Sequence, residues 1–431
     1  MVKLYNTKVI VVSAQSGITN ILQQISSHKK NAQTKDFINQ IYQIINPILK
    51  NIQSPQIKNR IKYFTDDLLF LSKISLRIYT KKLEDEILSY GERISSLLIK
   101  ELLYQYGLNV TNIDAKKIIK TNNNFTNAKP DIDLIKRKVE TYFFPILNNK
   151  KIIIMEGFIG SDIEDNTTTL SRGGSDYTAA LISQALNAKI LQIWTDVKGI
   201  YQIDPNIIKN ARIVKTIGFD EAAELATFGA KVLHPSTLWP TSNKNITIFV
   251  GSTFYPNIGG TWVKNIIDEK PIIRAITERN NQILLVIKSF NMANTRGFLA
   301  NIFTLLAQNN INVDLVSTSE ISVALTLNPH QQLHEITKSI LTEKILFELE
   351  SIGNIEVSIE ENLSLITLVG NNLNKKQGLS GELFSCLHNC NIRLFNHGAS
   401  HSNICILVKQ KDSTIAIQNI YNKIILKQQT I

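Results

Sequence analysis

The last third of the chain carries one sequence pattern twice, and this duplication constrains the fold more than any other feature. The two copies align without a gap at an offset of 81 residues. The aligned pairs are Gly297 with Gly378, Phe303 with Phe384, Leu306 with Leu387, Ile311 with Ile392, and Ser319 with Ser400. Each copy has the pattern of a strand, a turn, a helix and two further strands. The repeat is too long for a solenoid, so it predicts a duplicated small α+β module, for which a regulatory ligand-binding role is the natural hypothesis.

Residues 167–181 combine three threonines, Arg172, two glycines and Asp176 directly before a helical pattern. The glycines allow the backbone to approach a ligand, and the N–H groups of a helix that starts near Ser175 would face a negative group. The planar guanidinium of Arg172 suits a carboxylate or a phosphate. A glycine turn capped by Ser175 is the alternative, but it would not explain Arg172 and Asp176. The segment therefore favours an anion-binding site.

Three apolar, β-branched runs predict buried strands. Residues 8–13 run into a small-residue loop, residues 151–156 end at a glycine turn, and residues 190–195 end at Asp196. Open α/β sheets bind ligands at the carboxyl ends of their strands, so these three positions are candidates for a ligand site.

Two positions near helical patterns leave alternatives open. Residues 21–107 are mostly helical in pattern, and Gly91 beside Glu92 either has a functional role or marks a kink or helix boundary, since glycine costs a helix about 1 kcal/mol. A helix predicted over residues 219–228 is followed by Lys231 among small and apolar residues. That lysine is either a surface side chain with a buried stem or a phosphate contact.

Length and composition indicate a soluble protein of two or three domains, given 431 residues. The net charge of +11 comes from scattered basic residues, which argues against a nucleic-acid or membrane partner and gives a modest benefit for anionic substrates. The sequence shows neither an apolar run near membrane-span length nor a signal-peptide pattern, so we expect a cytoplasmic protein.

The three cysteines suggest a metal site only weakly. Cys386, Cys390 and Cys405 lie near His388, His397 and His401 in the sequence. Their spacing matches no usual zinc pattern, and the apolar run around Cys405 is typical of a strand core. We therefore expect no metal site and no disulfide framework, as in a reducing compartment.

In this order, the motifs resemble those of the aspartokinases, and specifically the monofunctional lysine-sensitive type. The resemblance covers nearly the whole chain. Its strongest elements are Ser-Ala-Gln-Ser-Gly-Ile-Thr-Asn at 13–20, Gly-Glu at 91–92, Gly-Phe-Ile-Gly at 157–160, the segment 167–181, Trp-Thr-Asp-Val at 194–197, Phe-Gly-Ala-Lys-Val-Leu-His-Pro at 228–235, and Val-Asp-Leu-Val-Ser-Thr-Ser-Glu at 313–320. So many ordered matches are far more specific than a single glycine motif.

The resemblance implies an α/β amino-acid-kinase fold, a three-layer α/β/α sheet over residues 1–268, followed by two α+β ACT modules. The modules would cover residues 269–361 and 362–431, in tandem or intertwined. The implied reaction transfers the γ-phosphoryl group of ATP, carried with Mg²⁺, to the side-chain carboxylate of L-aspartate. This step would open lysine, threonine and methionine synthesis, L-lysine would inhibit it, and the ACT modules would form a homodimer.

The resemblance also implies roles for single residues of the catalytic site. Arg172 would clamp a substrate carboxylate, Thr19 and Ser175 would donate hydrogen bonds, and Glu92 would accept from the substrate ammonium. The nucleotide pocket would be formed by Thr195, Asp196, Tyr201, Lys231 and Val232. Lys231 would also offset charge on the transferring phosphoryl group, and Asp176 would orient the catalytic lysines.

The implied inhibitor site lies in the first ACT module, where carboxylates would receive the lysine ammonium groups. Its residues would be Met292, Thr295, Gly297, Phe298, Leu299, Asp314, Ser319 and Glu320.

Two departures from the aspartokinase pattern qualify this expectation. Aspartokinases begin with a strand and a Lys-Phe-Gly-Gly-Thr-Ser loop whose lysine contacts the phosphate, and neither Lys3 nor Lys8 lies in such a loop. Either the sequence starts inside a longer reading frame, or the chain is a catalytically impaired lysine-binding protein. A kinase for another amino-acid carboxylate is a further alternative. Asn206 stands where relatives usually carry arginine, which would weaken ATP binding.

Overall fold

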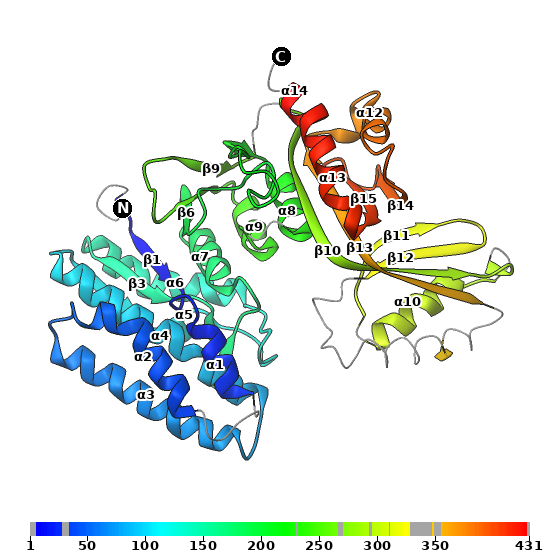
Figure 1. Ribbon diagram of the computed structural model, residues 1–431. Helices are drawn as coiled ribbons and strands as arrows, with labels where there is room; N and C mark the ends of the chain where they lie inside the picture. The colour runs from blue at the N-terminus through cyan, green and yellow to red at the C-terminus, as the bar shows by residue number, and fades with distance from the viewer. Residues whose placement is uncertain are drawn as a thin grey trace. The chain divides into compact units, whose positions relative to one another are not determined.

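The computed structural model describes residues 6–27, 34–229, 232–265, 270–292, 295–309, 311–327, 347–348 and 355–428 (Figure 1). The chain divides into two compact units, one made of Met1–Lys198 and Val232–Asn265, the other of Gly199–Lys231 and Ile266–Ile431. It therefore leaves the first unit, enters the second, and returns once before the duplicated region.

The first unit is built on parallel strands, as its buried β-branched runs predict. Strand β3 (Ile152–Glu156) lies between β1 (Val9–Val12) and β2 (Val110–Ile113) and pairs with both in parallel. Strand β6 (Ile190–Thr195) pairs in parallel with β8 (Thr247–Ser252), which also pairs with the antiparallel β9 (Gly260–Val263). A short hairpin of β4 (Ile159–Ser161) and β5 (Thr167–Thr169) follows β3.

Helices cover both faces of β3. The helices of this unit are α1 (Ile18–Ser26), α2 (Thr34–Leu49), α3 (Pro55–Ser75), α4 (Lys81–Gln105), α5 (Ala115–Ile118), α6 (Ile132–Asn148), α7 (Gly174–Ala185) and α9 (Pro235–Ser242). Ile153 and Met155 of β3 share one core cluster with side chains of α6 and α7, whereas Glu156 accepts a hydrogen bond from Ser96 Oγ of α4 at 2.5 Å. Because side chains alternate along a strand, α4 and α6 lie on opposite faces, which gives the three expected layers.

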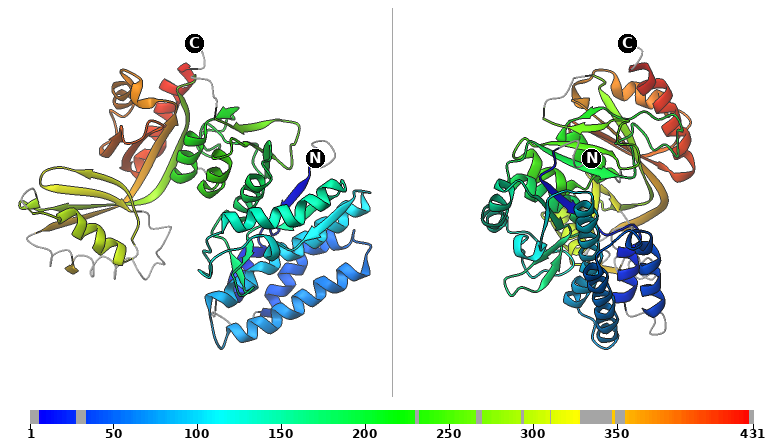
Figure 2. Two further views of the ribbon diagram at one scale, coloured as in Figure 1. Left: turned by 180° about the vertical axis from the view of Figure 1, so that it is seen from behind. Right: turned by 90° about the vertical axis from the view of Figure 1, so that its left-hand side faces the viewer.

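The helical pattern predicted for residues 21–107 is confirmed, and α1 to α4 run side by side (Figure 2). Polar caps define where two helices of the first unit begin. Thr80 Oγ1 accepts from Leu83 N–H at 3.1 Å at the start of α4, and Asp131 accepts from Leu134 N–H at 2.9 Å at the start of α6. Such caps satisfy N–H groups that a helix cannot pair internally.

The second unit contains a six-stranded antiparallel sheet. Its strand order is β11-β12-β10-β13-β15-β14. The strands are β10 (Ile273–Lys288), β11 (Val313–Thr318), β12 (Ser322–Leu327), β13 (Glu356–Gly370), β14 (Ile392–His397) and β15 (Asn403–Lys409). The helices are α8 (Phe219–Phe228), α10 (Phe298–Gln308), α12 (Leu379–Cys386), α13 (Gln410–Ile420) and α14 (Leu426–Gln428), with short helical turns at Leu373–Lys375 and Tyr421–Ile425. The duplicated order of helix and two strands is thus confirmed in both copies.

The two copies share their longest strands. The first part of β10 contributes Ile273 and Ile276 to a core with α12 and α13, while its last part contributes Ile283, Leu285 and Ile287 to a core with α10. The β10–β13 register shifts between these parts, at Arg279 to Gln282. One continuous sheet therefore serves both copies.

The cysteine-rich region has the strand expected around Cys405. That thiol is buried in β15 and lies 3.5 Å from Thr367 Oγ1. Over the described residues, no group of three or more His, Cys, Asp or Glu side chains is placed to hold a metal ion. The helices described also include none long and apolar enough to cross a membrane.

Candidate functional site

The carboxyl ends of β1 and β3 lie side by side in the first unit. Val12 pairs with Glu156 at the last position of both strands, and Gly157 N–H donates to Val12 C=O at 2.8 Å. Two loops therefore leave this edge of the sheet together. One leads into α1, and the other leads through the β4–β5 hairpin into α7.

Glu92 projects from α4 to the loop after β1. Ala14 N–H donates to Glu92 Oε1 at 3.1 Å, and Glu92 Oε2 is buried without a hydrogen-bond partner among the described residues. The side chain is 3% exposed. Burial raises the pKa of this carboxyl to about 7, although the Ala14 N–H opposes the shift. The site thus holds a carboxylate with one oxygen available for a ligand.

Gly91 makes this approach possible. Helix α4 runs unbroken through it, so the helix boundary considered for Gly91 is wrong. A Cβ at this position would lie 2.8 Å from Ala14 Cβ and 3.3 Å from Leu22 Cδ1. The glycine therefore allows α4 to pack directly against the loop after β1 and against α1.

Glycines bring the start of α7 equally close to the end of β3. A Cβ on Gly157 would lie 2.6 Å from Ser175 Cβ, and one on Gly173 would lie 2.5 Å from His234 Cβ. Gly173, with a φ of 77°, is the N-cap of α7, and no side chain caps this helix end. The turn capped by Ser175 is therefore wrong, since Ser175 lies inside the first turn. The N–H groups of that turn have no intrahelical partner, as an anion site requires.

The threonine hydroxyls of residues 167–169 have other partners, contrary to the expectation that they belong to the anion site. These residues form β5, whose side chains are buried. Thr169 Oγ1 donates to Asp85 Oδ1 at 2.5 Å, and Thr168 Oγ1 lies 2.7 Å from Thr121 Oγ1. Arg93 donates to Thr167 Oγ1 at 3.3 Å. Their role is to hold the hairpin in place, and the anion-binding features begin only at Arg172.

Arg172 and Asp176 flank the start of α7. Arg172 is exposed. Burial lowers the pKa of His234, and the positive charge of Arg172 lowers it further. Burial raises the pKa of Asp176 to about 6, and within the described part of the chain its carboxylate forms no ion pair. Lys231, which Asp176 is expected to orient, lies outside the described residues.

Thr19 is the second residue of α1 and is half-buried. It follows the loop whose Ala14 N–H reaches Glu92, so the structure brings Thr19, Glu92 and the start of α7 to neighbouring strand ends. These are the predicted substrate residues.

Thr195 and Asp196 lie at a second strand edge. Thr195 ends β6, its Oγ1 donates to Asp196 Oδ1 at 3.0 Å, and its C=O accepts from Thr253 N–H at 2.7 Å just after β8. Asp196 is exposed and follows the parallel pair β6–β8, where a nucleotide site is expected.

Two other predicted nucleotide residues belong to different units. Val232 is half-buried in the first unit, and Tyr201 belongs to the second unit, where it forms an isolated bridge with Ile213. Asn206 N–H and Nδ2 donate to Asp204 Oδ1 at 2.8 and 2.9 Å, so this residue serves a local turn.

The predicted inhibitor residues gather around the start of α10 and along β11. Met292 and Phe298 belong to one cluster with Val313. Gly297, with a φ of 78°, caps α10. Thr295 Oγ1 donates to Asn291 C=O at 2.8 Å, and Ser319 Oγ accepts from Ser322 N–H at 3.1 Å. Leu299 and Glu320 are exposed.

Asp314, on β11, already has a cationic partner. Its Oδ2 accepts from Arg279 of β10 in a largely buried ion pair. Sequence analysis did not identify Arg279, because nothing in its local pattern indicates a partner on another strand.

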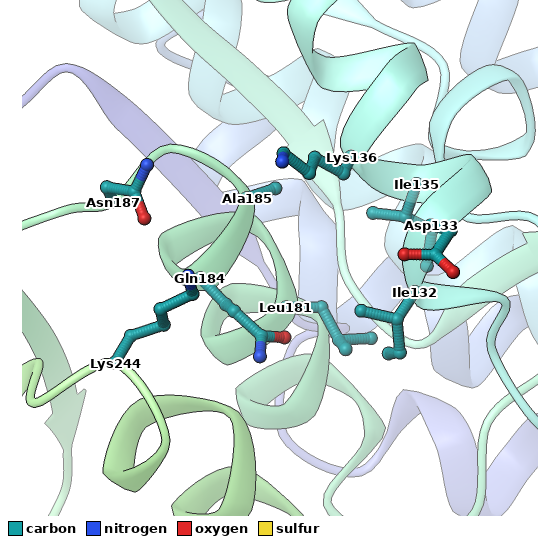
Figure 3. Close-up of a pocket in the computed structure, with 9 residues that line it drawn as sticks. All are labelled: Ile132, Asp133, Ile135, Lys136, Leu181, Gln184, Ala185, Asn187 and Lys244. Atoms are coloured by element: carbon teal, nitrogen blue, oxygen red, sulfur yellow. The ribbon is translucent and has the colours of Figure 1, made fainter.

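Figure 3 shows a hollow of about 210 Å³ in the first unit, between α6 and α7. Its polar lining comes from Asp133, Lys136, Gln184, Asn187 and Lys244, beside apolar side chains of both helices. It contains none of the predicted site residues.

Comparisons with known proteins identify the family of the chain. The amino acid kinase family matches residues 2–252, and the ACT domain matches residues 286–332 and 366–424. The chain is 40% identical to lysine-sensitive aspartokinase 3 of Escherichia coli (strain K12) over 420 residues. This alignment covers 97% of this chain and 93% of that protein.

Solved structures are similar over the same span. The crystal structure of E. coli aspartokinase III in complex with aspartate and ADP (R-state) has a TM-score of 0.86 at 39% identity, with 97% of this chain and 93% of that chain covered. The complex of the same enzyme with lysine and aspartate (T-state) has a TM-score of 0.80 at 40% identity and the same coverage. The chain therefore belongs to the amino acid kinase family, and within it is an enzyme of the aspartokinase family.

Proposed function

We propose that the chain transfers the γ-phosphoryl group of ATP to the side-chain carboxylate of L-aspartate, giving 4-phospho-L-aspartate and ADP. The observation that carries this proposal is the buried Glu92 carboxylate, whose Oε2 has no partner among the described residues. An uncompensated buried carboxylate is costly, and a ligand ammonium group would compensate it. The relative solved with aspartate and ADP supports the choice of substrate.

The reaction brings one anion to another, so positioning and charge neutralisation are the main tasks of the protein. A carboxylate oxygen of aspartate attacks the γ-phosphorus, and the bond to the β–γ bridging oxygen breaks. Glu92 would hold the substrate ammonium, and Arg172 with the N–H groups at the start of α7 would hold a carboxylate. Thr19 and Ser175 would donate hydrogen bonds to the substrate.

Lys231 would neutralise the transferring group, with Asp176 orienting it. Thr195, Asp196, Tyr201, Lys231 and Val232 would contact the nucleotide. Mg²⁺ would be carried by the phosphates of ATP. When bound, the ion would offset their charge.

We further propose that L-lysine inhibits the enzyme through Met292, Thr295, Gly297, Phe298, Leu299, Asp314, Ser319 and Glu320. The name of the lysine-sensitive relative and its lysine complex support this choice. The remaining proposals rest on the resemblance. The domains would cover residues 1–268, 269–361 and 362–431, and the ACT modules would form a homodimer. The enzyme would act in the cytoplasm, at the first step of lysine, threonine and methionine synthesis.

Trapping the acyl phosphate tests the reaction. Hydroxylamine converts 4-phospho-L-aspartate into a hydroxamate, so the full chain with ATP and L-aspartate should form ADP and hydroxamate in equal amounts. Formation with L-glutamate in place of L-aspartate would indicate a kinase for another carboxylate. Lysine binding without turnover would indicate a catalytically impaired lysine-binding protein, and either result would contradict the proposal.

A further inference from the structure

Arg279 connects the predicted inhibitor site to the end of α8. Its Nη2 donates to Asp314 Oδ2, and its Nη1 donates to Thr227 C=O at 3.3 Å. The guanidinium carbon lies 5.6 Å from the centre of the Phe228 ring. Thr227 and Phe228 are the last two residues of α8. Arg279 thus binds Asp314, a predicted inhibitor residue, through one guanidinium nitrogen and the end of α8 through the other.

The end of α8 and Gly229 pack against β10 around Arg279. Gly229 has a φ of 127°, and a Cβ there would lie 3.1 Å from Arg279 Cγ. Thr277 Oγ1 donates to Phe228 C=O at 3.2 Å, and Phe228 shares a buried cluster with Leu315, the neighbour of Asp314. The chain then continues through Ala230 to Lys231. The end of α8 and Gly229, which lies two residues before Lys231 in the sequence, are therefore held where Arg279 contacts α8.

An ammonium ligand at Asp314 competes with Arg279 for one carboxylate. Both groups are cations that seek the same oxygens, and in a largely buried site they repel each other strongly. A ligand that takes Asp314 weakens the hold on Arg279, and hence the contact of Arg279 with the end of α8.

We propose that Arg279 is the positioning residue through which an ammonium ligand at Asp314 acts on the end of α8 and on Gly229, which precede Lys231 in the sequence. The inference rests on the proposed function, because it takes L-lysine as the ligand and Lys231 as a phosphate contact. Linkage then requires a reciprocal effect, since removal of the competing Arg279 must strengthen lysine binding while it weakens inhibition.

The test compares the full chain with its Arg279→Gln variant. We expect the variant to bind lysine about 5- to 10-fold more tightly by calorimetry, to have a higher KM for ATP, and to lose most of its further inhibition by lysine. Hydrogen exchange of the 219–231 peptide should rise with lysine in the wild type. In the variant it should be high with or without lysine.

Two further variants separate this role from a structural one. Arg279→Lys keeps a cation for Asp314 but loses the planar fork, so lysine affinity should stay within about twofold while inhibition weakens. Arg60→Gln removes an exposed arginine that also stacks on a phenylalanine, Phe64, at 5.7 Å, and should change neither property.

The outcomes distinguish the two proposals. If the wild type binds no lysine, the proposed inhibitor is wrong and this inference falls with it. If the wild type binds lysine and is inhibited, but folded Arg279→Gln shows the same affinity, inhibition and exchange, the inference is wrong and the proposed function stands.

Discussion

Glu92 and Asp314 are both expected to receive an ammonium group from an amino acid, yet the structure prepares them in opposite ways. Glu92 is buried with one oxygen unpartnered among the described residues, and burial raises its pKa to about 7. Asp314 is held in an ion pair by Arg279. Among the described residues, Glu92 therefore has no cationic partner, whereas Asp314 is already paired with Arg279.

This difference fits the two tasks. A substrate site gains from being arranged before the ligand arrives, because little then has to be reorganised. A regulatory site must change when its ligand binds, and the exchange of one cation for another supplies that change. A ligand alters an equilibrium only through its different affinity for two states.

The largest effect is expected from Glu92→Gln. The amide keeps the shape of the side chain but cannot neutralise an ammonium, and breaking a buried ion pair costs about 3–5 kcal/mol. We expect kcat/KM for L-aspartate to fall at least roughly 100-fold, measured by steady-state ADP release. Glu140→Gln, on the exposed side of α6, is the matched control. A Glu92→Gln enzyme with unchanged kcat/KM would remove the substrate half of the comparison.

Gly91→Ala tests whether close packing places Glu92. The new Cβ would lie 2.8 Å from Ala14 Cβ, so we expect the free energy of unfolding to fall by about 1–3 kcal/mol. Gly381 lies in helix α12 with nothing within 4 Å of an added Cβ, and Gly381→Ala should stabilise by up to about 1 kcal/mol. Urea unfolding measures both variants, and equal effects would show that contact with Ala14 is unimportant.

Asp314→Asn removes the carboxylate for which Arg279 and the ammonium group of lysine are proposed to compete. We expect lysine affinity, measured by calorimetry, to fall about 10-fold, less than the effect of Glu92→Gln on aspartate, because part of the binding energy at Asp314 is spent on displacing Arg279. A loss as large as that at Glu92 would mean that Arg279 does not compete for this site.

The pH dependence of the free energy of unfolding should reveal the raised pKa of Glu92. The pKa of Glu92 is raised in the fold from 4.5 to about 7, so the folded state binds its proton more tightly than the unfolded state. The stability contribution is therefore present below pH 4.5 and is lost as the pH rises through about 7. Urea titrations from pH 5 to pH 8 should show a smaller decline in Glu92→Gln than in the wild type. Parallel curves would contradict the raised pKa.

Features set by local sequence were predictable. The strand 190–195 and the helix 219–228 have the predicted bounds, because β-branched runs and helical periodicity act over a few residues. The glycines at 173–174 were expected to let the backbone approach a ligand, whereas the neighbours that the structure places against them are the side chains of His234 and Phe158.

Features that join distant segments could not be predicted. The hydroxyl of Thr169 belongs to Asp85, 84 residues away, and Asp314 pairs with Arg279 across two strands. The duplication showed that two modules exist, but it could not show that β10 and β13 serve both. Such contacts depend on the tertiary fold and leave no trace in local periodicity.

The shared strands also set the order in which the chain can fold during synthesis. Ile273 at the start of β10 pairs with Gly370 at the end of β13, so β10 leaves the ribosome long before its partner is made. The edge of β10 must stay unpaired until residues 356–370 of β13 have been translated, because pairings this far apart in sequence form late. Until then that edge is open to pairing with other chains, and a chaperone that covers edge strands would act on this region first.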